Sequence, residues 1–175
     1  MNKTEIIQSL HTHHQPFADY IRSLPADDFM HRKESKWTAG QQAEHIIKAV
    51  SPVAMAFSLP RFMPRLLFGL SKRSSKTYEE LVAQYKAQLA KGGKASARYI
   101  PKPVDLQQQP FLPQQIMYYI GKICKQVEKI TEDELDRYML PHPLLGKLTL
   151  REMLYFTIYH VAHHHVITKR DVDIK

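Results

Sequence analysis

Four histidines lie within six residues near the end of the chain, in the segment Leu150–His165. The rest of this segment is mostly apolar, and in a helix positions four apart lie on nearly the same side. His160 and His164 therefore fall on the apolar face, whereas His163 and His165 lie at its edges, about 100° from its centre. Buried imidazoles need a partner for each ring nitrogen. A divalent metal ion would be a partner for one ring nitrogen of His160 and one of His164. A histidine pair at this spacing is typical of metal sites.

A metal site of this kind needs a third ligand from another element, since catalytic zinc usually has three protein ligands and one open position. His45 is the best candidate, because it lies on the apolar face of the helix expected after Thr38. Three neutral imidazoles would leave the ion its full positive charge, which favours an acidified water or an anionic fourth ligand. On spacing alone, however, a single histidine on a helix is more often a hydrogen-bonded residue than a ligand.

Helical periodicity dominates the chain, and no segment predicts a β-strand. We expect four long amphipathic helices, over residues 3–23, from Thr38 towards Phe57, over about 114–130, and from Thr149 onward. A shorter helix over 77–91 lies in the connection between the second and the third. The predicted fold is therefore an all-α four-helix bundle with a long crossover between helices 2 and 3 that carries an extra short helix.

Local signals mark the predicted helix ends. A capping box pairs a threonine with a Glu or Gln three residues later, and we expect one at Thr38 with Gln41, one at Thr131 with Glu134, and one at Thr149 with Glu152. Trp37, just before the first box, is expected to act as a hydrophobic staple. Prolines interrupt the helical pattern over 59–76 and again over 101–113, and the Pro141–Pro143 stretch predicts a loop before the last helix.

Composition predicts one soluble domain over residues 1–175, because 43% hydrophobic and 24% charged residues are ordinary for a globular protein. The single cysteine, Cys124, excludes an internal disulfide and a thiolate metal cluster, and it fits a cytoplasmic location. The first residues lack the order of a signal peptide, and no apolar run has membrane-spanning length. The net charge of +8 comes largely from residues 61–76 and 86–102, which lack the spacing of a nucleic-acid reader, so we expect a solvated basic surface.

Two segments resemble the DinB/YfiT-like superfamily of metal-binding four-helix bundles. Lys36–Ile47 is similar to the family's tryptophan, Ser/Thr and, eight residues after the tryptophan, histidine. Leu148–His164 is similar to its closing helix with two histidines four apart. With four helices in matching order, the resemblance covers nearly the whole chain. It implies a divalent metal ion, zinc or nickel, and an open position for solvent or substrate. The ligands it implies are His45, His160 and His164.

The chain also departs from the family pattern. Many relatives have an aspartate shortly after the first histidine, where this chain has Lys48. Relatives often have Gly or Arg beside the closing pair, where this chain has His163 and His165. The connection over 59–112 is longer than a minimal bundle needs, so it is expected to reshape the pocket.

The resemblance implies a metal-dependent enzyme acting on a small molecule, with two competing activities. One is hydrolysis by metal-activated water, which needs a general base, and no carboxylate stands out for that role. The other is transfer of a low-molecular-weight thiol to an electrophile, which needs only a bound thiolate and an apolar pocket. A non-enzymatic, stress-linked metal-binding protein is the alternative, and a cavity that reaches the ion would favour catalysis over it. Nucleic acid and membrane are not expected as partners, and a homodimer is left open.

Other candidate residues are better explained by packing. His11, His13 and His14 could form an auxiliary metal site or line the pocket, but a polar helix face with one snorkelling imidazole is the favoured interpretation. His163 could replace a ligand or bond to one. Glu44 should point away from the neighbouring histidine. Cys124 is expected to be an inert core residue.

Overall fold

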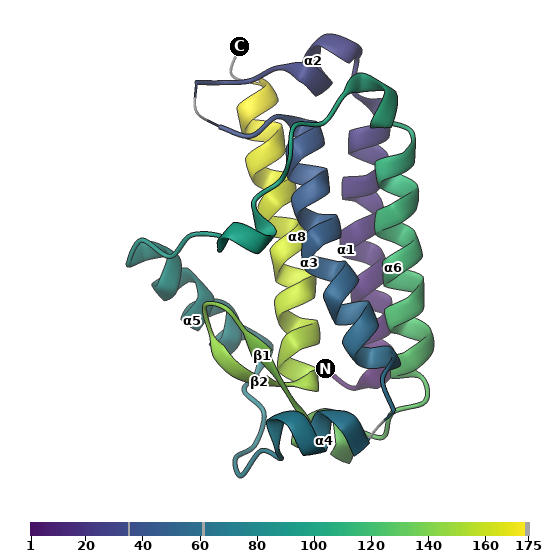
Figure 1. Ribbon diagram of the computed structural model, residues 1–175, viewed down its shortest axis with the longest axis vertical. Helices are drawn as coiled ribbons and strands as arrows, with labels where there is room; N and C mark the ends of the chain where they lie inside the picture. The colour runs from purple at the N-terminus through teal and green to yellow at the C-terminus, as the bar shows by residue number, and fades with distance from the viewer. Residues whose placement is uncertain (35, 61, 174–175) are drawn as a thin grey trace.

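Four long helices lie side by side and enclose the core (Figure 1). They are α1 (Lys3–Ser23), α3 (Ala39–Ser58), α6 (Phe111–Val127) and α8 (Leu150–Asp173). Helices α6 and α8 each pack against both α1 and α3, and all four contribute buried apolar side chains such as Leu10, Ile46, Ile120 and Leu154. This computed structural model describes residues 1–34, 36–60 and 62–173. It is predominantly helical, which confirms the all-α prediction.

The predicted capping boxes are all present. In each, the threonine side chain accepts a hydrogen bond from the backbone N–H three residues on, and the Glu or Gln side chain accepts one from the backbone N–H of the threonine. These bonds satisfy N–H groups that a helix start leaves without partners. They begin α3, the short helix α7 (Glu132–Arg137), and α8.

The connection between α3 and α6 contains more helix than the sequence predicted. The expected helix is present as α5 (Tyr78–Ala90), but α4 (Phe62–Phe68) was not predicted, because two prolines obscured the pattern. Pro64 lies in the first turn of α4, where a missing N–H loses no intrahelical bond. Short 3-10 turns follow, η1 (Ala97–Tyr99) and η2 (Leu106–Gln108), and a five-residue helix α2 (Ala26–Met30) precedes α3.

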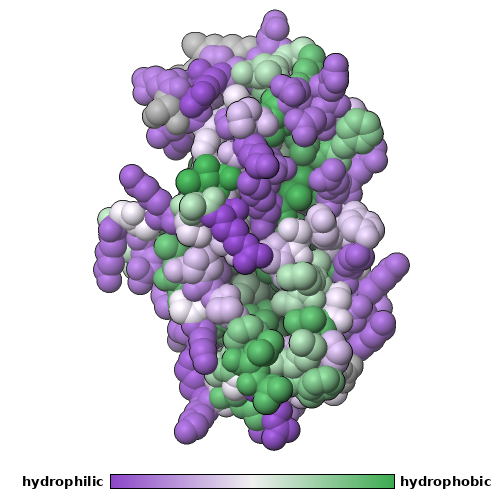
Figure 2. Space-filling model, viewed as in Figure 1, coloured by the Kyte–Doolittle hydropathy of each residue, from purple (hydrophilic) through white to green (hydrophobic). Residues whose placement is uncertain are grey.

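Helix α4 packs on the core through Phe68 but leaves other apolar side chains exposed. Phe62 is 66% exposed and Leu66 is 80% exposed, whereas Pro64 is buried. Figure 2 shows apolar side chains gathered at this lower end of the molecule. Arg61, the first residue of the basic stretch 61–76, lies outside the described residues.

A two-stranded hairpin replaces the loop predicted before the last helix. Strands β1 (Met139–His142) and β2 (Gly146–Thr149) pair antiparallel, with Leu140 opposite Leu148. The prediction of no strand was wrong because four residues, one of them a proline, are too few to show an alternating pattern. The hairpin leads directly into α8 and brings His142 close to the histidine-rich helix.

No described helix is by itself long and apolar enough to cross a membrane. Helices α3 and α4 together meet that test by length and composition, with a bend of 113° between them.

Candidate metal centre

The structure brings together the three predicted ligands, His45 from α3 and His160 and His164 from α8. The Nε2 atom of His160 lies 3.2 Å from that of His45 and 3.1 Å from that of His164. Zinc binds imidazole nitrogen at about 2.0–2.1 Å, so the ligand atoms of a tetrahedral site lie about 3.3 Å apart. Within the described ranges this is the one group of three metal-ligating side chains whose atoms all lie within 4.8 Å of one another.

Two of the rings are oriented by hydrogen bonds from their other nitrogen. The Nδ1–H of His45 donates to the backbone carbonyl of Tyr99 at 2.7 Å, and the Nδ1–H of His164 donates to Oε1 of Gln42 at 2.6 Å. A neutral imidazole that donates through Nδ1 has its lone pair on Nε2. The lone pairs of both rings therefore face the Nε2 atom of His160, which can donate at most one N–H and so can pair with only one of them. A cation between the three rings would accept a lone pair from each, and such outer hydrogen bonds are usual for histidine ligands.

All three imidazoles are buried and stay in the neutral form that binds metal. Burial lowers the pKa of His160 and of His164 well below the usual range, and the neighbouring histidines lower it further. Burial also lowers the pKa of His45, against the opposing effect of its bond to Tyr99. No proton therefore has to be displaced at neutral pH before an ion binds.

Aromatic rings pack against the three histidines. Trp37 lies with its ring centroid 5.0 Å from that of His45 and is stacked on His164 at 6.4 Å. Phe156 is stacked on His160 at 4.8 Å. Trp37 was predicted as a helix staple, and its packing on two histidines from different helices could not be predicted from local spacing.

A cavity of about 410 Å³ reaches all three histidines. Its walls are mostly apolar and come from α3, α5, the hairpin and α8, with Trp37, Tyr85 and Phe156 as the large aromatic members. Two basic side chains, Lys94 and Arg98, also line it, and no Asp or Glu of the described residues does. The long connection after α3 therefore does shape the pocket, as expected, and the three histidines face the cavity on one side.

His142 was not predicted as a site residue, because it lies between two prolines in a segment that was predicted to be a loop. Its Nδ1 accepts hydrogen bonds from the backbone N–H groups of Leu144 and Leu145, at 3.2 and 3.1 Å. Burial lowers the pKa of His142 to about 4, so the ring is neutral with its proton on Nε2. Because His142 lines the cavity, it offers one fixed hydrogen-bond donor there.

The remaining predicted residues lie outside the ligand group. His163 is half-buried in the cavity wall beside Tyr85, with ring centroids 6.2 Å apart. His14 is fully buried and bonds through Nδ1 to the carbonyl of Leu10 at 2.8 Å, so the favoured snorkelling interpretation was wrong. Cys124 is buried, and burial raises the pKa of its thiol to about 11, in keeping with the inert role predicted for it.

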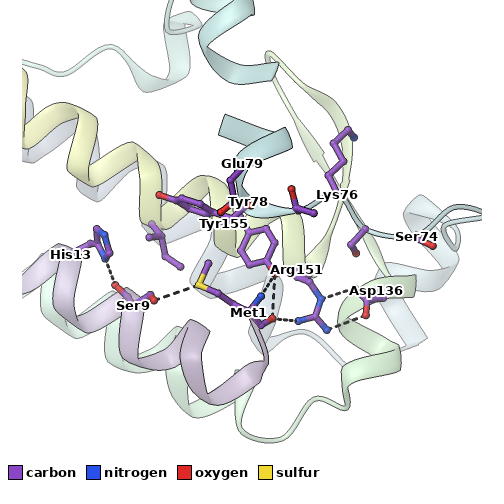
Figure 3. Close-up of a pocket in the computed structure, with 13 residues that line it drawn as sticks. Met1, Ser9, His13, Ser74, Lys76, Tyr78, Glu79, Asp136, Arg151 and Tyr155 are labelled. Atoms are coloured by element: carbon purple, nitrogen blue, oxygen red, sulfur yellow. Dashed lines mark hydrogen bonds and ion pairs between the residues drawn. The ribbon is translucent and has the colours of Figure 1, made fainter. Parts of the chain in front are cut away.

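A second cavity, of about 640 Å³, lies beside the start of α8 and shares no lining residue with the first. Figure 3 shows Arg151 directed at Asp136 and at the main chain of Met1. Arg151 is 8% exposed and also pairs with Glu132. Because its hydrogen bonds already go to carboxylates and to the backbone, this group fixes the start of α8 against α7.

Comparisons with family models, with curated proteins and with solved structures found no match for this chain. The resemblance to the DinB/YfiT-like superfamily therefore stays a prediction from the sequence.

Proposed function

We propose that this chain is a metal-dependent enzyme in which His45, His160 and His164 hold one divalent ion. The observation that carries the proposal is the convergence of the three Nε2 atoms, at 3.1 and 3.2 Å, while the Nδ1 atoms of two rings are bonded elsewhere. Zinc and nickel both accept imidazole ligands and are the ions we propose, although copper and iron accept them too. In this proposal the four long helices are the four-helix bundle of the DinB/YfiT-like superfamily.

A divalent ion held by three neutral imidazoles would keep its full charge and lower the pKa of a water or thiol in its remaining position. A structural ion is usually enclosed by four protein ligands, so the cavity beside the three rings supports an enzyme over a non-enzymatic metal-binding protein. Gln42 and Tyr99 fix the ligand rings, and the aromatic wall excludes water from a bound substrate.

Transfer of a low-molecular-weight thiol to a small electrophile is the activity that the cavity supports best. In that reaction the sulfur forms a bond to the electrophilic carbon, the leaving group departs with the electron pair, and the thiol proton goes to solvent. It needs an apolar pocket and no general base in the protein. The walls around the histidines are apolar, and no described carboxylate lines them. The Nε2–H of His142 is available to donate to an oxygen of the substrate.

Hydrolysis is the second candidate, and His163 is the observation in its favour. Its imidazole lines the cavity, and burial lowers its pKa, with Arg170 and Lys86 acting in the same direction. A neutral imidazole at pH 7 can accept a proton from an attacking water, provided it lies within hydrogen-bond reach of that water.

Metal content and turnover together test the proposal. Purified wild-type protein, His164→Ala and His163→Ala are exposed to zinc or nickel, and bound metal is measured after gel filtration. We expect one ion per chain in the wild type and in His163→Ala, and none in His164→Ala. The loaded wild type is then assayed with glutathione or cysteine and chlorodinitrobenzene, and separately with p-nitrophenyl acetate.

Each outcome has a distinct meaning. Turnover that requires a thiol supports transfer, and turnover of the ester without a thiol, lost in His163→Ala, supports hydrolysis. Wild-type protein that binds no divalent ion under metal-replete conditions overturns the proposal. A loaded protein that turns over neither kind of substrate leaves the non-enzymatic alternative.

A further inference from the structure

The cavity beside the three histidines combines an apolar interior with basic side chains and lacks acidic ones. Lys94 and Arg98 line it, whereas no described Asp or Glu does. Both basic side chains belong to exposed residues, and neither has an ion pair with a described residue. We propose that this cavity binds an organic anion with an apolar body, whose acidic group faces Lys94 and Arg98. The inference rests on the proposed function in taking this cavity as the substrate site.

The interior suits an apolar chain or ring. Tyr85 and Phe156 meet edge to face, with ring centroids 5.2 Å apart, and Trp37 and Met153 add further apolar wall. A volume of about 410 Å³ lies within the usual range for sites that bury a small organic molecule. Removing such a body from water provides most of the affinity.

The basic residues come from the segment that also orients a ligand of the proposed metal. Arg98 lies in η1, next to Tyr99, whose carbonyl accepts the hydrogen bond from His45. The Nζ atom of Lys48 donates to the carbonyl of Ile100 at 2.7 Å and ties the end of this turn to α3. Arg98 therefore belongs to a turn that is fixed to α3, and its guanidinium lies over the Tyr99 ring, 6.0 Å from the centroid. An anion that binds it is placed relative to the histidines.

Charge complementarity selects the class of ligand. A cation would meet two positive side chains and no described carboxylate, and a neutral apolar molecule would gain nothing from them. A carboxylate or sulfonate gains two attractive interactions near the protein surface, and both weaken as salt is added. An electrophile or thiol that carries an acidic group would satisfy this requirement in the proposed reaction.

Calorimetric titration with eight-carbon probes tests the inference directly. Octanoate, octanol and octylammonium share one apolar body and differ in charge. We compare the wild type with the double variant Lys94→Gln, Arg98→Gln. The control is Lys91→Gln, Lys102→Gln, which removes the same charge from exposed residues of the same segment that do not line the cavity.

We expect octanoate to bind the wild type and the control alike and the cavity double variant about tenfold more weakly, with octanol unaffected by either change. Octanol that binds as tightly as octanoate, or an equal loss in the control, overturns the inference. Loss of octanoate binding in His164→Ala together with full binding in the cavity double variant also overturns it, because the anion would then face the metal instead.

Metal content, measured in every variant, separates this inference from the proposed function. A wild type that binds zinc but not octanoate contradicts the inference alone. A wild type that binds octanoate but no divalent ion contradicts the proposed enzyme and leaves the anion site in place.

Discussion

The Nδ1 atom of His164 on α8 lies 2.6 Å from the Oε1 atom of Gln42 on α3. This contact joins two helices that also contribute the converging imidazoles, since His45 is one turn from Gln42 and His160 is one turn from His164. Gln42 is 4% exposed, so its amide makes this bond without competition from solvent. The bond fixes which nitrogen of His164 presents its lone pair to the other histidines.

We predict that Gln42→Leu lowers metal affinity by about 10–100-fold, because the His164 ring loses its fixed orientation. Gln42→Glu should retain affinity, since its carboxylate can accept the same bond. Competition against a chromogenic chelator measures the affinities, and circular dichroism checks the fold. Glu44→Gln, on the same helix but outside the cavity lining, is the control. Equal affinities for Gln42→Leu and the wild type would show that this bond does not support the site.

Glu152 is the buried anchor of the segment that leads into α5, and its loss should destabilise the fold. It is 0% exposed and accepts hydrogen bonds from Arg73, from the Lys76 N–H and from the Thr149 N–H. Burial alone would raise the pKa of Glu152, but these bonds outweigh it and hold the pKa below its usual value. We expect Glu152→Gln to lower the free energy of unfolding by about 2–3 kcal/mol in urea titrations.

The exposed pair of Arg137 and Asp133 supplies the comparison for that measurement. It has the same charges at 3.4 Å, but its two side chains are 53% and 72% exposed. Asp133→Asn should therefore leave the urea midpoint unchanged within error. If both variants lost the same stability, burial of Glu152 would not be the cause.

Features set by local spacing were predictable from the sequence. His160 and His164 share a face because they are four residues apart, and the capping boxes need only two side chains three residues apart. The burial of His14 was also predictable, because it is four residues from Leu10 and three from Phe17 and therefore lies on the same face of α1. The favoured interpretation was a snorkelling imidazole on a polar face, and it was wrong because the ring is fully buried.

Features that depend on distant contacts left no comparable signal. The partner of His45 is a backbone carbonyl, which any residue at position 99 would supply. The roles of Trp37 and His142 arise only when α3, the hairpin and α8 come together. Helix α4 and the hairpin are too short for their periodicity to be read, and both contain a proline that suggested a loop.

Two glycine-to-alanine substitutions should change stability in opposite directions. A Cβ added at Gly121, inside α6, would meet nothing within 4 Å. Because alanine has the higher helix propensity, Gly121→Ala should stabilise the protein by about 0.5–1 kcal/mol. A Cβ at Gly40 would lie 2.6 Å from Cζ of Phe29 and 2.9 Å from Cγ1 of Val104. Gly40→Ala should therefore destabilise it by about 1–3 kcal/mol, and thermal and urea unfolding would show the opposite shifts. A stabilised Gly40→Ala would contradict the close packing of α2 on α3.

The buried imidazole of His14 should make stability depend on pH in the acid range. Burial lowers its pKa from the ordinary 6.5 to about 3, against the opposing effect of its bond to the Leu10 carbonyl, and its Nε2 has no partner in the described part of the chain. The unfolded chain therefore binds a proton that the folded chain does not between about pH 6.5 and pH 3. The stabilisation from keeping His14 neutral is complete above pH 6.5 and is lost as the pH falls, by about 1.4 kcal/mol for each unit.

His14→Leu removes this dependence while keeping a side chain of similar size in the core. We expect its unfolding free energy to be within about 1 kcal/mol of the wild type at pH 7.5, where the lost Leu10 bond is offset by removal of the unpartnered Nε2. At pH 4.5 the variant should be the more stable of the two by about 2 kcal/mol, from urea titrations on chelator-treated protein. His11→Leu, at an exposed position on the same helix, should keep the pH dependence of the wild type. Parallel pH profiles for His14→Leu and the wild type would mean that His14 accepts a proton in the folded state, which its complete burial argues against.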